Sequence, residues 1–332
     1  MTPYNVFMST VDDFLKREYE NMIPSFSIPD DPASFQSWKE SVRKELRRKL
    51  CIDEKPTFGD VSVISEEDCG SYVRKCMAFS MDGLVCPFYL LVPKEKPAAL
   101  VLALPGHGVG VKDAIGLCEE ESYQKKFALR LCENGFAVVA PELLGFGDMR
   151  LNEDKESDDS NSCHRLAMNL LFEGKTLLGM RVQEARCSLT IASSMFPSLR
   201  RGVMGISGGG TVATFLTALS DDISAAVISG YAGFFRTSIL AMHHCVCNYV
   251  PGLLQSFELP TILSSIAPVP MLWESGDKDP IYPQKAAEEA SVIVGKCYRL
   301  LGHEEAFSCD FFSGEHEIHG VKAYRFLKDN LR

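Results

Sequence analysis

Short apolar runs alternate with helical patterns along most of the chain, and this alternation restricts the fold more than any other feature. Continuous apolar runs, typical of strands buried on both faces, occur at residues 98–104, 136–140, 202–206, 225–229 and 271–274. Helical patterns lie between them at residues 120–133, 178–195, 211–219 and 284–294. The alternation predicts an α/β fold with a mostly parallel central sheet and helices on both faces.

The amino-terminal part has a different pattern. Residues 11–22 and 32–50 mix apolar and charged residues at helical spacing, and Pro29, Asp30 and Asp31 separate them as a loop. We therefore expect a helical extension over residues 1–55 and the main α/β domain over residues 56–332.

Three further segments interrupt the strand and helix alternation. Residues 72–80 and 85–92 flank the turn Met81-Asp82-Gly83 and predict an antiparallel hairpin. Residues 152–163 are acidic and polar, which indicates an exposed loop. Residues 231–266 form a long insertion with prolines and aromatic residues, and we expect a cap-like segment that shapes access to the site.

Charge and composition exclude several classes of partner. The formal net charge is -10, which disfavours nucleic acid, and the basic run at 43–49 is typical of a solvated helix face. No apolar run is long enough to span a membrane, and the first residues lack the pattern of a secretory signal. The 12 scattered cysteines are then expected to be reduced thiols of a cytoplasmic protein. The oligomeric state stays open, a homo-oligomer included.

The strongest local motif is Gly205-Ile206-Ser207-Gly208-Gly209, between a predicted strand and a predicted helix. It resembles the nucleophile elbow of α/β-hydrolases, in which small residues two positions either side of the serine permit a tight, strained turn. The alternative is an ordinary glycine turn before a helix. We favour Ser207 as the nucleophile, because the following helix start can stabilise an oxyanion.

A serine nucleophile needs a base and a residue that orients the base, and on this fold they follow in the order acid, then histidine. After the strand at 271–274 comes Gly276-Asp277-Lys278-Asp279-Pro280. We favour Asp279 as the acid, because G-x-x-D before apolar residues and a proline is its usual form. Asp277 is the alternative and is expected to support the turn.

The base is expected in the loop after the last strand, which we place at residues 309–312. His316 lies just beyond the turn there, where its imidazole could reach Ser207. His319 is the weaker candidate, since it is expected in the first turn of a final helix over residues 321–331. His303 and His164 have still weaker positions.

An oxyanion hole needs a second donor besides the N–H of Gly208. The loop after the strand at 98–104 reads Pro105-Gly106-His107-Gly108, and we expect the main-chain N–H of His107 to be that donor. The alternative of a phosphate-binding loop is disfavoured, because neither GxGxxG nor GK[ST] is present.

The sequence His243-His244-Cys245-Val246-Cys247 invites a metal interpretation. Adjacent ligands converge on one ion with difficulty, and no second C-x-x-C or H-x-x-x-H lies nearby. We therefore expect this segment to pack or to line a pocket, and we predict neither a metal nor a cofactor.

Together these motifs resemble the α/β-hydrolase group that includes acetyl xylan esterases and dienelactone hydrolases. The resemblance covers residues 72–332 and rests on LPGHGVG, GFGD, GISGGG, the segment ISGYAGFFRTSILAMHHCVCNYVPGLL, ESGDKDPIYP and FFSGEHEIHG. It implies a triad of Ser207, Asp279 and His316, with serine in place of the cysteine of dienelactone hydrolases. One departure is Pro105, which stands where a histidine often begins the oxyanion loop, so the second donor stays open between His107 and its neighbours.

The sequence thus predicts a serine esterase, a carboxylesterase that acts on small soluble molecules with short acyl groups such as acetyl. Without an export signal, a polymeric substrate outside the cell is disfavoured. A peptidase or thioesterase would use the same residues, and a non-catalytic binding protein on the same fold would differ by a broken triad.

Overall fold

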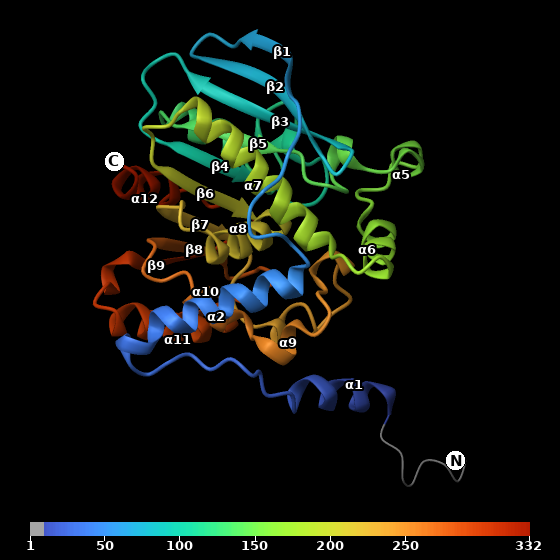
Figure 1. The fold of residues 1–332 in the computed structure, drawn as a ribbon, viewed down its shortest axis with the longest axis vertical. Helices are drawn as coiled ribbons and strands as arrows, with labels where there is room; N and C mark the ends of the chain where they lie inside the picture. Colours follow the sequence, from blue (N-terminus) through green and yellow to red (C-terminus); the bar gives the residue numbers. More distant parts are fainter. Residues whose placement is uncertain (1–9) are drawn as a thin grey trace.

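The computed structural model describes residues 10–332, and a nine-stranded sheet runs through this part of the chain in the order β1-β2-β3-β5-β4-β6-β7-β8-β9 (Figure 1). From β5 to β9 neighbouring strands are parallel, whereas β1, β2 and β3 form an antiparallel extension that joins the sheet through β5. The strands are β1 (Val61–Asp68), β2 (Tyr72–Met81), β3 (Leu84–Pro93), β4 (Leu100–Leu104), β5 (Ala137–Pro141), β6 (Arg201–Ile206), β7 (Ala225–Ser229), β8 (Met271–Gly276) and β9 (Phe307–Phe312).

Side chains of the central strands alternate between two buried layers. In β4, Leu100, Leu102 and Leu104 enter the larger layer, which α2, α7, α8, α10 and α11 cover. Val101 and Ala103 enter the smaller layer, which α3, α4 and α12 cover. Both faces of the sheet are therefore packed against helices, which confirms the predicted α/β fold.

The helices in the described residues vary from single turns to five turns. The α-helices are α1 (Val11–Glu20), α2 (Pro32–Leu50), α3 (Val111–Ala114), α4 (Phe127–Glu133), α5 (Asn152–Glu156), α6 (Cys163–Phe172), α7 (Leu177–Met195), α8 (Gly208–Leu219), α9 (Leu253–Ser256), α10 (Leu259–Ser264), α11 (Gln284–Leu300) and α12 (Ala323–Asn330). Short 3₁₀ turns are η2 (Gly147–Met149), η3 (Phe235–Thr237), η4 (Val246–Asn248) and η5 (Glu304–Ala306). None of these helices has the length and apolar character of a membrane span.

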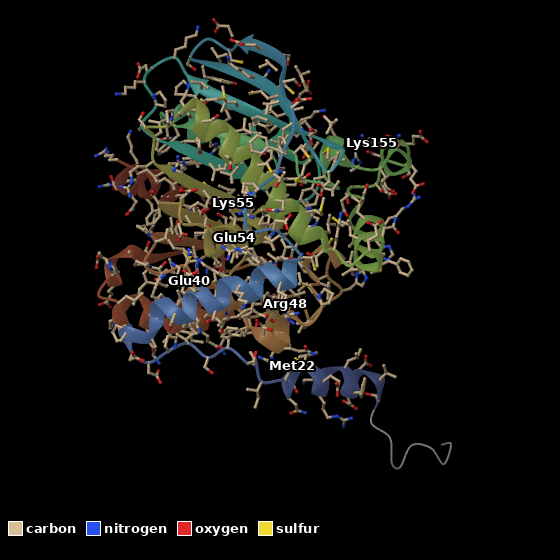
Figure 2. All side chains as sticks on the ribbon, in the orientation of Figure 1. Met22, Glu40, Arg48, Glu54, Lys55 and Lys155 are labelled. Atoms are coloured by element: carbon tan, nitrogen blue, oxygen red, sulfur yellow. The ribbon has the colours of Figure 1, made fainter. Side chains whose placement is uncertain are left out.

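The two amino-terminal helices relate differently to the rest of the molecule. Val42 and Leu46 on α2 are fully buried in the larger layer, while Glu40 and Arg48 point outward from the same helix (Figure 2). In contrast, α1 buries no residue and lies beside the body of the protein (Figure 1). Residues 1–9 of the predicted extension lie outside the described residues.

The predicted hairpin is confirmed, since β2 pairs with β3 around Asp82 and Gly83. The sequence missed β1, an edge strand whose residues are all exposed and which has no apolar face toward the core. The predicted helix at 120–133 begins only at Phe127, and the predicted loop at 152–163 contains α5 and the start of α6. In the first case the upstream residues Tyr123 and Gln124 form a turn that contacts the loop after β4.

Candidate active site

Ser207 occupies the sharp turn between β6 and α8 and has φ 56° and ψ -120°. A non-glycine residue rarely adopts such a conformation, and nucleophile elbows hold their serine in this strained form. A Cβ at Gly209 would collide with the main-chain oxygen of Leu104, and one at Gly205 would collide with the main chain of Gly209. The glycines two positions either side of Ser207 are thus required by close backbone approach.

Asp279 and His316 lie together at the carboxyl end of the sheet. Asp279 Oδ2 is 2.7 Å from His316 Nδ1, and the Asp279 side chain is only 1% exposed. Its other oxygen, Oδ1, accepts hydrogen bonds from the main-chain N–H groups of Ile281 and Tyr282, at 2.8 and 2.9 Å. The carboxylate is therefore fixed in one orientation toward the imidazole.

The His316 ring lies between two tyrosines and beside the nucleophile elbow. Tyr123 and Tyr282 stack against it, with centroid distances of 5.9 and 6.1 Å. Its ring atoms come so close to Gly230 that a Cβ there would lie 2.7 Å from Cε1. Gly230 follows Ser229, whose carbonyl accepts the hydrogen bond of the Ser207 N–H at 3.0 Å.

The second imidazole nitrogen of His316 is available for chemistry. Nε2 is buried and has no hydrogen-bond partner among the described residues. Catalytic hydrogen bonds of unliganded enzymes are often long and tighten on substrate binding, so the lack of a partner for Nε2 does not argue against a role as a base.

The loop after β4 is held against the elbow by the turn before α4. The Tyr123 hydroxyl donates to the carbonyl of His107 at 2.7 Å, and Gln124 Oε1 accepts from the N–H of Gly106 at 2.9 Å. Within the described residues, the main-chain N–H groups of His107 and Gly208 donate to no other group. Both predicted oxyanion donors are therefore unoccupied by the protein itself.

The buried carboxyl of Glu142 also supports the loop after β4. The sequence pattern did not reveal it. Glu142 follows β5 and accepts hydrogen bonds from the N–H groups of Val111 and Asp148, at 3.1 and 3.4 Å. Burial raises the pKa of Glu142 to about 8. The only sequence signal was its position directly after a strand, at the end of the sheet where ligands bind.

The structure separates the alternative acid and base from the pair just described. Asp277 is exposed and accepts from the N–H of Gly314 at 3.0 Å, which is the turn-supporting contact expected for it. His319 Nδ1 is 2.7 Å from Asp310 Oδ2, so it forms a second histidine–aspartate pair. The expectation that His319 lies in the final helix is wrong, because α12 begins only at Ala323. Its contact with Asp310 holds it in the preceding loop.

The buried side chains of Glu274 and Ser229 connect the end of β7 to the loop after His316. Glu274, fully buried in β8, accepts from the Ser229 hydroxyl and from the N–H of Gly320, both at 2.7 Å. Burial raises the pKa of Glu274. It thereby ties the end of β7, next to the elbow, to the loop that follows His316.

The segment at 243–247 lies close to the predicted oxyanion loop. His107 Nε2 is 3.2 Å from Cys247 Sγ, and Cys163 and Cys245 complete a group of four potential metal ligands. None of the 12 cysteines, all of which lie in the described residues, is joined in a disulfide.

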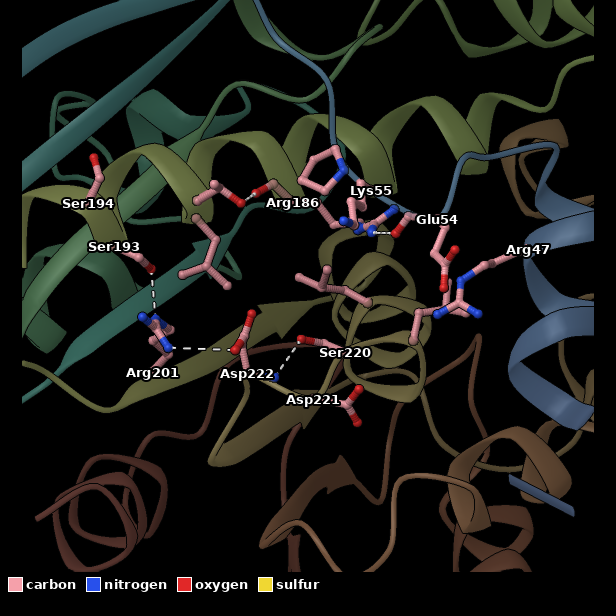
Figure 3. Close-up of a pocket in the computed structure, with 15 residues that line it drawn as sticks. Arg47, Glu54, Lys55, Arg186, Ser193, Ser194, Arg201, Ser220, Asp221 and Asp222 are labelled. Carbon is pink, nitrogen blue, oxygen red and sulfur yellow. Dashed lines mark hydrogen bonds and ion pairs between the residues drawn. The ribbon is translucent and has the colours of Figure 1, made fainter. Parts of the chain in front are cut away.

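A cleft of about 660 Å³ lies at the opposite end of the sheet, beside the first residue of β6 rather than after its last (Figure 3). Arg201 in this cleft contacts Ser193 and Asp222, and Arg186 donates to the carbonyl of Glu54. It holds no pairing of a nucleophile with a base, so we assign the chemistry to the elbow end of the sheet.

Comparisons with known proteins agree with this geometry. The abhydrolase family model matches residues 6–311. The Bacillus subtilis protein YtaP, which is assigned as a hydrolase, is 30% identical over 292 residues, covering 79% of this chain and 93% of its own.

Solved structures show the same fold at lower identity. A protein assigned as an acetyl xylan esterase in Bacteroides fragilis has a TM-score of 0.78 and 16% identity, with 98% of this chain and 91% of its own covered. A glucuronoyl esterase from Solibacter usitatus has a TM-score of 0.60 and 15% identity, with 88% and 92% covered. With the family match over nearly the whole chain and the sheet order described above, the chain belongs to the abhydrolase family and has the α/β-hydrolase fold.

Proposed function

We propose that this protein is a serine carboxylic ester hydrolase in which Ser207 is the nucleophile, His316 the general base and Asp279 the residue that orients the base. The observation that carries the proposal is the 2.7 Å contact between Asp279 Oδ2 and His316 Nδ1, beside a serine held at φ 56°. A strained serine and an oriented histidine are the two parts that acyl transfer requires.

The proposed reaction starts with a proton transfer. With Nδ1–H donated to Asp279, the lone pair of His316 Nε2 accepts the Ser207 proton, and the serine oxygen forms a bond to the acyl carbon. The carbonyl electrons move to the oxygen, which the N–H groups of Gly208 and His107 stabilise. Collapse of this intermediate breaks the bond to the alcohol, which leaves with the proton from His316. Water then attacks the acyl-enzyme by the same steps and releases the acid.

The rings close to the elbow support a short acyl group such as acetyl. A side chain at Gly208 would meet His107 Nδ1 at 2.9 Å and Phe146 Cζ at 3.1 Å, so aromatic and imidazole rings lie close on this side of the nucleophile. The structural likeness to a protein assigned as an acetyl xylan esterase agrees with this, as does the acidic surface, which favours a small acylated molecule over a nucleic acid.

A fluorophosphonate probe tests the nucleophile directly, because it labels only an activated serine. We expect wild-type protein to be labelled on Ser207 and to hydrolyse p-nitrophenyl acetate. The Ser207→Ala variant should lose the label and at least about 10³-fold of the turnover. Ser194→Ala, in the cleft of Figure 3, is the matched control and should retain both.

A folded wild-type protein that takes no label on Ser207 would contradict the proposal and favour a non-catalytic role for the fold. The acyl specificity has its own measurement, a series of p-nitrophenyl esters of increasing chain length. We expect kcat/KM to fall beyond the shortest acyl groups, and a preference for long chains would show that the acetyl assignment is wrong.

A further inference from the structure

Four side chains of metal-binding type converge beside the candidate active site. The Nε2 atom of His107 and the Sγ atoms of Cys163, Cys245 and Cys247 all lie within 4.8 Å of one another. They come from three separate segments: the loop after β4, the first residue of α6, and η4 with the residue before it. The chain brings them together only in the folded state.

The distances suit one tetrahedral ion. Bonds of about 2.3 Å from zinc to sulfur place tetrahedral ligands roughly 3.8 Å apart. The separation of His107 Nε2 from Cys247 Sγ is 3.2 Å, and that of Cys245 Sγ from Cys247 Sγ is 3.1 Å. The remaining separations are at most 4.8 Å, so every pair lies within about 1 Å of the tetrahedral value.

A buried arginine supplies an independent observation. Arg181 is 2% exposed, and its Nη2 lies 3.1 Å from Cys163 Sγ. Among residues 10–332 its other contacts include the carbonyl of Leu144 and the ring of Phe146, and the buried Glu184 acts on it only from beyond ion-pair distance. A buried cation is costly unless a negative group accompanies it closely. A zinc ion with three thiolates and a neutral imidazole carries a net charge of -1, which Arg181 would balance.

Outer contacts also resemble those of a metal centre, in which neighbouring groups orient the ligands. Asn248 Nδ2 lies 3.5 Å from Cys247 Sγ, and its Oδ1 accepts from the Thr211 hydroxyl at 3.1 Å, in the first turn of α8. The Phe146 ring packs against the His107 imidazole at 4.5 Å and also against the Arg181 guanidinium at 3.9 Å. The cluster is thus fastened to the helix that begins at the nucleophile.

We propose that His107, Cys163, Cys245 and Cys247 bind one zinc ion in a closed site with four protein ligands. On binding, the three thiols release their protons and form bonds from sulfur to the metal, while His107 coordinates through Nε2. Four protein ligands leave no open position, so the ion has a structural role. It joins the oxyanion loop to α6 and to the segment at 245–247, and it directs the Nδ1 edge of His107 toward Gly208.

Metal analysis of the full-length protein tests the proposal. Protein purified under reducing conditions, without a chelator, should contain about one zinc per chain by inductively coupled plasma mass spectrometry. Cys163→Ser and Cys247→Ser should each reduce the zinc content at least about tenfold. Cys187→Ser and Cys297→Ser, at buried cysteines outside the cluster, are the matched controls and should keep the metal.

A second measurement keeps the test valid if the cluster variants fail to fold. Wild-type protein reconstituted with Co²⁺ should show a thiolate-to-cobalt charge-transfer absorption and the visible bands of a tetrahedral site. Peptide mapping after alkylation should show Cys163, Cys245 and Cys247 protected until a chelator is added. Ser207→Ala should bind the metal like the wild type, which separates this proposal from the esterase assignment.

Three results would overturn the proposal. One is wild-type protein without stoichiometric zinc and without the cobalt charge-transfer absorption after dialysis against each metal. Another is a disulfide among the three cysteines in protein that was purified under reducing conditions. The last is zinc retained in full by folded Cys163→Ser and Cys247→Ser variants.

Discussion

Asp279 uses its two oxygens for different purposes. One oxygen contacts His316 and the other is held by two main-chain N–H groups of the following turn, so the carboxylate cannot rotate away from the imidazole. Asp277, two residues earlier, accepts from Gly314 and faces solvent. Two neighbouring aspartates thus differ in burial, partner and expected contribution to the reaction.

We expect Asp279→Asn to lower kcat for p-nitrophenyl acetate by on the order of 10³- to 10⁴-fold, because an amide no longer favours the imidazole tautomer with a free Nε2. Asp277→Asn keeps an acceptor for the Gly314 N–H and should change kcat by no more than a few-fold. Steady-state kinetics of both variants, with circular dichroism as a check on folding, make the comparison. The reverse ranking would assign the acid to Asp277.

Sequence patterns favoured Asp279 over Asp277 because of chain order and of spacing after a strand, and Asp279 is the one that contacts His316. They could not identify Glu142 or Glu274, whose hydrogen-bond partners come from loops remote in sequence. Nor could they find Cys163 as a neighbour of Cys247, because 84 residues separate the two and only the packing of α6 brings them together. Such contacts depend on tertiary structure and leave no local pattern.

At the scale of elements, the junction between β6 and α8 requires unusually close backbone packing. The first turn of α8 lies directly against the end of β4, and the main-chain oxygen of Leu104 occupies the place where a side chain of residue 209 would be. This packing sets the position of the elbow relative to the loop that follows β4. The glycine at position 209 of the motif is therefore required because β4 and α8 lie so close together.

We predict that Gly209→Ala lowers the free energy of unfolding by about 1–3 kcal/mol or more, because main-chain atoms must move to accept the methyl group. Gly295→Ala in α11 is the control, since its Cβ would meet only ordinary contacts and should add about 0.5–1 kcal/mol to helix stability. Urea unfolding of both variants measures the difference. A Gly209→Ala protein as stable as the wild type would show that β4 and α8 can move apart without loss of stability.

Strands buried on both faces were predictable, whereas the edge strand β1 was not. The runs in β4, β5, β6, β7 and β8 are continuous because both faces of the sheet are covered, so composition alone marks them. β1 has no buried residue and is fixed only by pairing with β2. The helix pattern before Phe127 failed because Tyr123 and Gln124 make turn contacts to the loop after β4 instead.

At the scale of the whole molecule, the amino-terminal helices do not form one unit. α2 contributes Val42, Leu46 and Leu50 to the same buried layer as the sheet, and Arg43 donates to carbonyls at the end of α8. Removing α2 would expose that layer, whereas α1 buries nothing. The helical periodicity of the sequence predicted both helices but could not show that only α2 belongs to the core.

Buried carboxyls link the stability of the whole molecule to pH. Burial raises the pKa of Glu142 to about 8 and that of Glu184 to about 7. Between the unfolded value of 4.5 and these folded values, the native protein keeps protons that the unfolded chain releases. Each group therefore makes its full contribution to the free energy of unfolding below about pH 4.5. This contribution is lost as pH rises through the folded pKa of the group.

We predict that Glu142→Gln weakens this pH dependence, because the amide stays neutral in the buried site at every pH. Between about pH 5 and about pH 9, the wild type should lose on the order of a few kcal/mol more unfolding free energy than the variant, since one pKa unit corresponds to about 1.4 kcal/mol. Urea unfolding over a pH series measures the two slopes, with exposed Glu133→Gln as the control. Equal slopes for wild type and Glu142→Gln would mean that Glu142 is ionised in the native protein. The loop after β4 would then be held by a charged carboxylate, and its main-chain N–H contacts would have to compensate for the cost of burying that charge.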